Sequence, residues 1–291
     1  MPTTACLYFH ECPSCGVLMK PKLGDCCVFC SYGDVPCPPI QADRSCGEAD
    51  CGEGAQQAVE PEDSSRSVLN PAVLTTSDAR AAFDAVMRQG FNGKFRDPLP
   101  RAEAAMLSHI LTFFADAGRS PSSAELAASS GLEITEAARS IGSLAARDFV
   151  VIDETGQLTG AYPFTNRPTP HRVAFAGTAA TVHAMCAIDA LGAGSIVDQD
   201  IEITSSCASC HGPIIAMTFD KGRKLGAISP PQTLVKVGAT DPCSCAADTL
   251  CPAIEFICCS GEACVPGAGL LLSAADALEV GRALFENRAR R

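Results

Sequence analysis

Apolar residues recur every three or four positions through two stretches in the first half of the chain. The stretches are DARAAFDAVMRQGF (78–91) and RAEAAMLSHILTFFADAG (101–118). An α-helix has about 3.6 residues per turn, so this spacing gathers the apolar side chains on one helix face. Both stretches are therefore predicted to be amphipathic helices that pack against a core.

A second pair of helices and two strands are predicted next. Serines just before Glu125 are placed to cap a helix, Gly131 makes a turn, and a further helix is expected over residues 135–146. The run DFVVIDETGQLTG then has the pattern of strand, turn and strand. This order is typical of a winged helix-turn-helix, so residues 71–165 are predicted to form a helical, winged-helix-like part.

From Arg172 onward, the pattern changes to short runs of β-branched and aromatic residues bounded by Gly, Pro or Ser. These runs, RVAFAG, SIVDQDIEITSSC, PIIAMTF, TLVKVG and AIEFICC, predict strands. The apolar segment HAMCAIDALG (183–192) predicts a helix between the first two strands, and SAADALEVGRALFENRAR predicts an amphipathic helix at the end. The predicted fold class is α+β, with residues 166–291 forming a small mixed or antiparallel β-sheet core with flanking helices.

Residues 1–51 have a different character, because nine of the 18 cysteines lie there. Two Cys-x2-Cys pairs bracket a Gly- and Pro-containing turn, a spacing typical of a zinc ribbon or knuckle. A structural zinc ion is predicted on Cys12, Cys15, Cys27 and Cys30. Cys26 is an alternative to Cys27, and a mercury- or copper-trapping thiol cluster or an iron–sulfur centre are alternative uses of this Cys-rich module.

Composition and charge exclude several classes of function. The 291-residue chain has a formal net charge of −11, which disfavours nucleic acid as a partner because its phosphates are also negative. It has no apolar run of about 18 residues, so no membrane span is predicted, and the N-terminus lacks the pattern of a signal peptide. The expected location is the cytoplasm, where cysteine clusters more often bind metals or do chemistry than form disulfides.

Residues 52–70 are rich in Gly, Ser and acidic residues and show no apolar periodicity. This composition predicts a flexible linker between the Cys-rich module and the rest of the chain.

The segment at 183–192 combines a thiol and a carboxyl group in apolar surroundings. In a helix, Cys186 and Asp189 are three positions apart and face the same side. Burial raises the pKa of a carboxyl group, so a proton stays available near neutral pH, and a thiolate holds a soft metal. The pair suits protonation of a carbon bound to a soft metal. From spacing alone, an ordinary buried cysteine beside a surface or capping acid is the alternative.

From about Pro71 to the C-terminus, the chain resembles the alkylmercury lyase (organomercurial lyase) family. HAMCAIDALGAG resembles the Cys-x-x-Asp segment of the family, IEITSSCASCHGPIIAMT its strand–Cys–turn–strand unit, and LCPAIEFICC the segment of its second mercury-binding thiol. The resemblance implies that Cys186 and Cys251 bind mercury, that Asp189 delivers a proton, and that Cys207 is a structural thiol. It says nothing about residues 1–51.

The position of the second mercury-binding thiol depends on the register of LCPAIEFICC. With Cys251 at that position, Phe256 and Ile257 fall on a hydrophobic pair of the family. The alternative register uses Cys258 or Cys259.

The resemblance implies that the protein cleaves the carbon–mercury bond of organomercurials by protonolysis. The products would be a hydrocarbon and bound Hg(II), with no organic cofactor, small thiols as carriers, and a mercuric reductase as the acceptor in mercury detoxification. The alternative is a non-enzymatic mercury- or metal-sensing or sequestering protein, which the winged-helix pattern favours.

The second half of the chain also holds thiols that the resemblance does not explain. The spacing of Cys207-Ala-Ser-Cys210 and Cys243-Ser-Cys245 is compatible with a tetrahedral zinc site. In that case Cys207 would be a zinc ligand rather than a core thiol.

Overall fold

The computed structural model describes residues 10–11, 18–19, 28, 32, 68–91, 95, 98–240, 246–259 and 269–288. The chain divides into two compact units, Met1–Glu62 and Asp63–Arg291. In the first unit, β1 (His10–Glu11) pairs antiparallel with β2 (Leu18–Met19). The predicted zinc ligands Cys12, Cys15, Cys27 and Cys30 lie outside the described residues, as do residues 52–67 of the predicted linker.

The second unit begins with helices, and the predicted pattern is confirmed with small shifts. The helices are α3 (Ser77–Val86), α4 (Arg101–Ala117), α5 (Ser123–Ser130) and α6 (Ile134–Ala146). A short 3-10 turn (Pro71–Val73) precedes α3, and a π-helical turn (Met87–Phe91) replaces the last predicted turn of the first helix. None of the helices in the described part of the chain is long and apolar enough to cross a membrane.

Capping explains where α5 begins and ends. The Ser122 hydroxyl accepts the backbone N–H of Glu125, and the Glu125 carboxylate accepts the backbone N–H of Ser122. This reciprocal pair satisfies two N–H groups that a helix start otherwise leaves unpaired. Gly131 ends the helix with a φ of 70°, a left-handed conformation that glycine adopts without a steric cost.

Eight strands form one antiparallel sheet in the order β10-β9-β8-β6-β7-β5-β4-β3. Their bounds are β3 (Val150–Ile152), β4 (Leu158–Ala161), β5 (Phe164–Thr165), β6 (Arg172–Phe175), β7 (Thr181–Ala184), β8 (Ile201–Ser206), β9 (Pro213–Phe219) and β10 (Lys224–Ser229). A smaller antiparallel sheet has the order β12-β11-β13, with β11 (Leu234–Gly238), β12 (Ile254–Ile257) and β13 (Gly269–Ser273). The fold is therefore mixed α+β with antiparallel sheets, as predicted.

The strands of the expected wing are part of the large sheet. β3 and β4 follow α6, as the sequence pattern predicts, but β4 pairs onward with β5, and β5 pairs with β7. One continuous sheet thus spans the predicted boundary between residues 71–165 and 166–291. The winged-helix interpretation stays a prediction.

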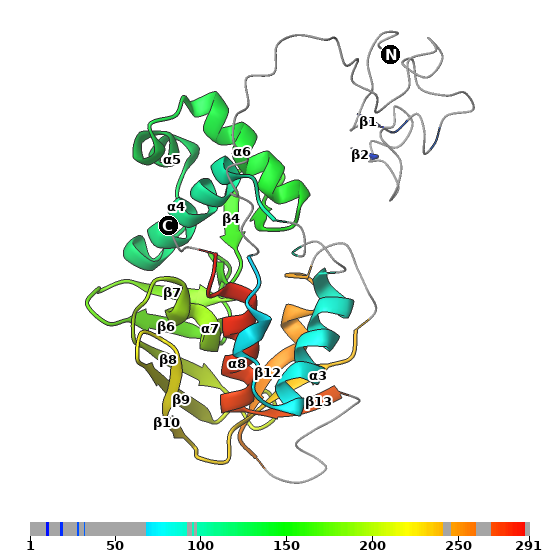
Figure 1. The fold of residues 1–291 in the computed structure, drawn as a ribbon, viewed down its shortest axis with the longest axis vertical. Helices are drawn as coiled ribbons and strands as arrows, with labels where there is room; N and C mark the ends of the chain where they lie inside the picture. Colours follow the sequence, from blue (N-terminus) through cyan, green and yellow to red (C-terminus); the bar gives the residue numbers. More distant parts are fainter. Residues whose placement is uncertain are drawn as a thin grey trace, which may run out of the picture. The chain divides into compact units, whose positions relative to one another are not determined.

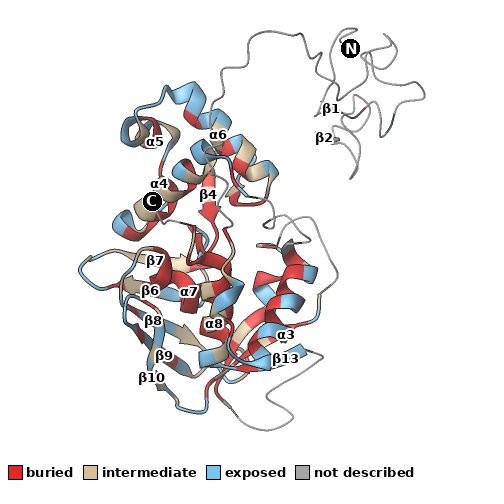
Figure 2. Ribbon diagram, in the orientation of Figure 1, coloured by how far each residue is buried: buried red, intermediate tan, exposed pale blue. Residues whose placement is uncertain are grey.

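Two helices build the centre of the second unit, α7 (Ala187–Ile196) and α8 (Ala274–Phe285). All ten residues of α7 are buried (Figure 2). This helix packs on β6, β7 and β8 of the large sheet, on β12 of the small sheet and on α8. α8, drawn in red in Figure 1, also contacts α3. α7 is therefore enclosed by both sheets and by a second helix.

Small residues let α7 and α8 approach closely. A Cβ atom added at Gly192 would lie 2.8 Å from the carbonyl carbon of Gly281, and one at Gly281 would lie 2.7 Å from the carbonyl oxygen of Ile188. A side chain at either position would force the two backbones apart. The glycine pair thereby sets the position of α7 against α8.

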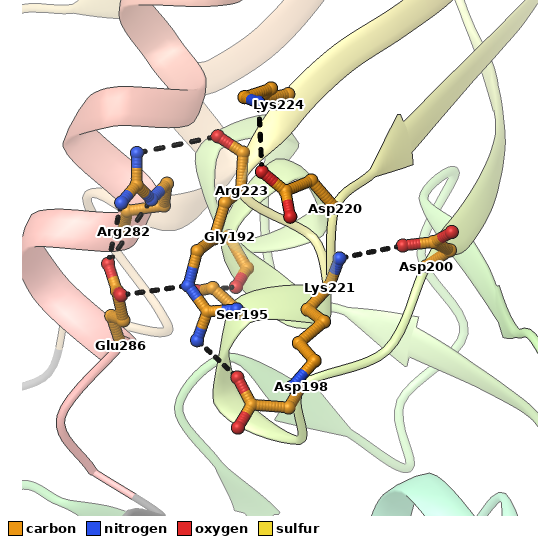
Figure 3. Close-up of polar contacts among 10 residues, drawn as sticks. All are labelled: Gly192, Ser195, Asp198, Asp200, Asp220, Lys221, Arg223, Lys224, Arg282 and Glu286. Carbon is orange, nitrogen blue, oxygen red and sulfur yellow. Dashed lines mark hydrogen bonds and ion pairs between the residues drawn. The ribbon is translucent and has the colours of Figure 1, made fainter.

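A polar network joins α8 to the turn between β9 and β10 (Figure 3). The Arg223 guanidinium donates to Glu286 Oε1 at 3.1 Å and also binds Asp198, which follows α7. Arg282 donates to the other Glu286 oxygen at 3.0 Å and to the Arg223 carbonyl at 3.4 Å. The Glu286 carboxylate is buried and therefore needs partners within the protein, and an arginine binds each of its two oxygens.

Candidate active site

Cys186 occupies the position directly before α7. The preceding strand β7 ends at Ala184, and the helix begins at Ala187, so the predicted helix over 183–192 is wrong in its first part. The backbone at Cys186 is extended, and its Sγ accepts the N–H of Asp189 at 3.3 Å. Cys186 is the N-cap of α7, which brings its thiol to the same end of the helix as Asp189.

Burial controls the protonation of Cys186. The side chain is only 1% exposed, and this burial raises the pKa of its thiol above the ordinary value. A hydrogen bond with Cys251 opposes the shift, and the negative charge of Asp189 reinforces it. Cys186 therefore keeps its proton near neutral pH until a base or a metal removes it.

Asp189 lies in the first turn of α7 and is 3% exposed. Burial raises the pKa of its carboxyl group to about 7, because the ionised form loses its hydration. Hydrogen bonds with Cys186 and Cys251 and the positive charge of Arg288 oppose this rise. Near neutral pH, both protonation states of Asp189 are populated, which suits a group that accepts and returns a proton.

Cys251 reaches the same place from the short 3-10 turn Cys251–Ala253 that precedes β12. Its backbone N–H donates to the Ala246 carbonyl at 2.9 Å, and its thiol donates to Asp189 Oδ2 at 3.8 Å. One ligand atom each of Cys186, Asp189 and Cys251 lie within 4.8 Å of one another. We call these three residues the thiol–acid triad.

Arg288, just after α8, is a charged residue near the triad that sequence reasoning did not identify. It is 3% exposed, its Nε donates to the Leu284 carbonyl at 2.9 Å, and its guanidinium lies 4.1 Å from the centre of the Phe95 ring. Burial lowers the pKa of Arg288 to about 9, and the charge of Asp189 opposes that shift. No spacing signal connects a residue at the end of the chain with Asp189, so only the fold identifies this pair.

A cleft of about 360 Å³ leads to the triad. Cys251 lines it together with Met185 and His171, whereas Cys186 and Asp189 are not among its lining residues. Burial lowers the pKa of His171 to about 4, with the nearby charge of His183 adding to the shift, so the imidazole is neutral near pH 7. A molecule that enters the cleft therefore meets Cys251 on a largely apolar wall.

Two soft thiols beside a carboxyl group of raised pKa, in a closed site, fit the chemistry of soft metals. Comparison with protein families gives a consistent result. Residues 164–286, which include the whole triad, match the family model of MerB, alkylmercury lyase. This part of the chain belongs to the alkylmercury lyase family. The protein is accordingly an enzyme of the carbon–mercury lyase class.

A solved structure shares the fold of this chain. The chain is similar to the crystal structure of the mercury-bound form of MerB2, with a TM-score of 0.54 and 20% sequence identity. The match covers 74% of this chain and 100% of that chain. A search of curated proteins found no match.

The other described cysteines of the chain form a second group. Cys207 and Cys210 lie in the turn between β8 and β9, and Cys258 and Cys259 directly follow β12. Ligand atoms of Cys207, Cys210 and Cys258 lie within 4.8 Å of one another. Cys251 is thus the cysteine of its segment that reaches Asp189, while Cys258 and Cys259 lie with Cys207.

The environment of Cys207 differs from that of an isolated core thiol. Burial alone would raise its pKa, but backbone N–H groups of Cys210, Cys258 and Ser209 donate to the sulfur and lower the pKa to about 6. Burial raises the pKa of Cys258 to about 12, and hydrogen bonds and charge from Cys210 and Cys207 add to this rise. The spacing-based zinc set included Cys243 and Cys245, which lie outside the described residues.

Proposed function

We propose that this protein cleaves the carbon–mercury bond of organomercurials by protonolysis. The observation that carries the proposal is the thiol–acid triad, in which two buried thiols and a buried carboxyl group of raised pKa share one site. Mercury requires thiolate ligands, and the carbon bound to it requires a proton. The triad offers both at one point.

The cleft supports Cys251 as the first thiol to meet the substrate, because Cys251 is the triad residue that lines the cleft. An organomercurial carried on a small thiol would exchange partners there. The Cys251 sulfur replaces the small thiol on mercury, and the departing thiolate takes the Cys251 proton. The organomercurial is then bound to the protein through one sulfur.

Asp189 supports the second step. Its carboxylate lies close enough to Cys186 to accept the proton of that thiol, and the resulting thiolate binds the mercury. A second sulfur ligand increases the electron density on the carbon bound to mercury. The proton that protonates this carbon is now on Asp189.

In the last step, Asp189 transfers its proton to the carbon. The electron pair of the carbon–mercury bond becomes the new carbon–hydrogen bond, the hydrocarbon leaves, and Hg(II) remains on Cys186 and Cys251. Asp189 returns to its carboxylate form, so no oxidant, reductant or organic cofactor is consumed. Small thiols would then remove the Hg(II) and pass it to a mercuric reductase.

Headspace gas chromatography tests this function directly. Purified full-length protein is mixed with methylmercury and excess small thiol, and methane is measured over time. We expect methane from the wild type and a loss of at least about a hundredfold in Asp189→Asn, which keeps the side-chain shape but has no acidic proton.

Mercury binding by Asp189→Asn provides the control, because both thiols of the triad remain. The variant should still bind methylmercury, as measured by the mercury content of the desalted protein. If the wild type binds mercury and releases no methane, the protein sequesters or senses mercury instead. If Asp189→Asn releases methane at the wild-type rate, the proton comes from another group.

A further inference from the structure

A second group of thiols lies outside the triad and has no part in the proposed reaction. It consists of Cys207, Cys210, Cys258 and Cys259, and we call it the four-thiol cluster. Two segments far apart in sequence contribute to it, the β8–β9 turn and the residues after β12. The Cys258 backbone N–H donates to Cys207 Sγ at 3.3 Å, and the Ala208 N–H donates to the Phe256 carbonyl at 2.9 Å.

Two sulfur–sulfur distances in this cluster have the size that a tetrahedral metal site requires. Cys210 Sγ lies 3.7 Å from Cys258 Sγ, and Cys207 Sγ lies 3.8 Å from Cys259 Sγ. A tetrahedron with zinc–sulfur bonds of about 2.3 Å has edges of about 3.8 Å. Two sulfur pairs, which together use all four sulfurs, therefore already have this length, and ligand atoms of Cys207, Cys210 and Cys258 lie within 4.8 Å of one another.

The surroundings of the sulfurs also suit bound thiolates. Several thiolates this close together repel one another unless a cation lies between them. Backbone N–H groups of the Cys207–Cys210 turn and of Cys258 donate to Cys207, which compensates part of the negative charge on a metal-bound sulfur. Gly212 leaves space at this turn, because a Cβ there would lie 3.3 Å from Cys210 Sγ.

We propose that Cys207, Cys210, Cys258 and Cys259 form a structural site for one zinc ion, separate from the mercury-binding triad. Three sulfurs lie within 4.8 Å of one another and the Cys259 sulfur lies 3.8 Å from that of Cys207, so a small movement of Cys259 would complete the closed four-sulfur coordination of structural zinc. This assignment differs from the spacing-based one because Cys258 and Cys259 provide the second pair of ligands. It does not depend on the reaction proposed for the triad.

Zinc in this site would link the two sheets of the unit. The Cys207–Cys210 turn belongs to the large sheet, and Cys258 and Cys259 follow β12 of the small sheet. Cys251 precedes the same strand β12. The ion would hold one end of a short strand whose other end carries a thiol of the triad.

Thiol labelling of the wild-type full-length protein is the first test. Cys210 is exposed, so in the absence of metal it should react rapidly with an alkylating reagent. With one equivalent of zinc or more, labelling of Cys210 and Cys259 should slow at least tenfold, and a strong chelator should restore it. Peptide mapping by mass spectrometry reads each cysteine separately from those in residues 1–51.

Zinc content of variants is the second test. Cys210→Ser and Cys258→Ser should each bind one zinc ion fewer per chain than the wild type by native mass spectrometry. Cys186→Ser is the matched control, because it removes a thiol of the triad and should leave the zinc count unchanged. Circular dichroism shows whether each variant is folded. If a variant does not fold, the labelling test still decides, because it uses the wild-type protein.

Any of three results would overturn the proposal. One is rapid labelling of Cys210 in wild-type protein saturated with zinc. Another is a mass decrease that shows Cys210–Cys258 or Cys207–Cys259 disulfides in protein purified under reducing conditions, because these pairs would then be redox partners. Binding of mercury but not zinc at these four thiols would equally contradict a structural zinc site.

Discussion

Asp189 illustrates how far a single residue depends on its surroundings. An aspartate in water has a pKa of 3.8, and burial raises that of Asp189 to about 7. The residue sits in a helix with no exposed positions, and both thiols of the triad lie beside it. The raised pKa lets one carboxyl group accept a proton from a thiol and deliver it to carbon near neutral pH.

The pKa of Asp189 predicts a pH dependence of stability. Between about pH 4 and pH 7, the folded protein holds a proton at Asp189 that the unfolded chain has lost. The free energy of unfolding therefore falls as pH rises through this window, by about 1.4 kcal/mol for each unit of pKa difference. Asp189→Asn has no such loss. The free energy of unfolding of Asp189→Asn minus that of the wild type should therefore increase up to about pH 7 and then level off. Urea denaturation across this pH range measures the difference.

Asp153→Asn is a control of opposite sign. Asp153 is exposed, and hydrogen bonds from Thr155 and the Gln157 backbone lower the pKa of its carboxyl group. Its contribution to stability is present above the unfolded pKa and is lost as pH falls through the lower folded pKa. The pKa assigned to Asp189 would be wrong if Asp189→Asn and Asp153→Asn followed the same pH trend.

At the scale of elements, α7 carries the chemistry and α8 holds it in place. The two helices meet at Gly192 and Gly281, where added side chains would collide with backbone atoms. Gly192 lies about one turn after Asp189, so a displacement at this contact also displaces the carboxyl group from Cys251. The glycines are needed for this close contact although glycine lowers intrinsic helix stability.

A pair of glycine variants tests this contact. Gly192→Ala should lower the free energy of unfolding by about 1–3 kcal/mol, because the new Cβ has no space. Gly142→Ala in α6 is the matched control, since a Cβ there meets nothing within 4 Å. It should raise stability by about 0.5–1 kcal/mol through the better helix propensity of alanine. Denaturant unfolding compares them, and a stabilising effect of Gly192→Ala would refute the close approach.

At the scale of the whole second unit, the polar network of Figure 3 ties the end of α8 to the large sheet. Glu286 is the centre of this network, with one oxygen bound by Arg223 and the other by Arg282. The same region contains Lys224 and Asp220, which form an ion pair at 3.0 Å with both side chains at least half exposed. The buried Glu286 network should contribute more to stability than the Lys224–Asp220 pair, because water screens the exposed pair well.

This difference predicts unequal costs for two charge-removing substitutions. Glu286→Gln should lower the free energy of unfolding by about 2–4 kcal/mol, because two partly buried arginines lose their counterion. Lys224→Ala should change it by less than about 1 kcal/mol. Thermal unfolding at low and moderate salt provides the comparison, and equal effects would show that the Glu286 network is as screened as the surface pair.

Local pattern was enough to predict most elements, because each depends on neighbours in sequence. The periodicity of residues 101–118 predicted α4, and the serines before Glu125 predicted the cap of α5. Short strands without a strong alternating pattern were missed, namely β5, β7, β10 and β13. Because β7 was missed, the helix that became α7 was predicted to begin too early. Pairing with β5 and β6 holds residues 181–184 in a strand, so α7 begins at Ala187.

The sequence by itself determined which groups are available: the Cys-x-x-Asp pair at Cys186 and Asp189, the abundance of thiols, and the amphipathic helices. Only the tertiary structure decided which distant groups meet. Chain folding places Cys251, the thiol that the resemblance favoured over Cys258 and Cys259, at Asp189. It also brings Arg288 near that carboxyl and Cys207 together with Cys258, which the sequence did not indicate. The reason is physical: spacing along the chain controls contacts within one element, whereas contacts between elements, and the burial that shifts a pKa, arise only when sheets and helices pack.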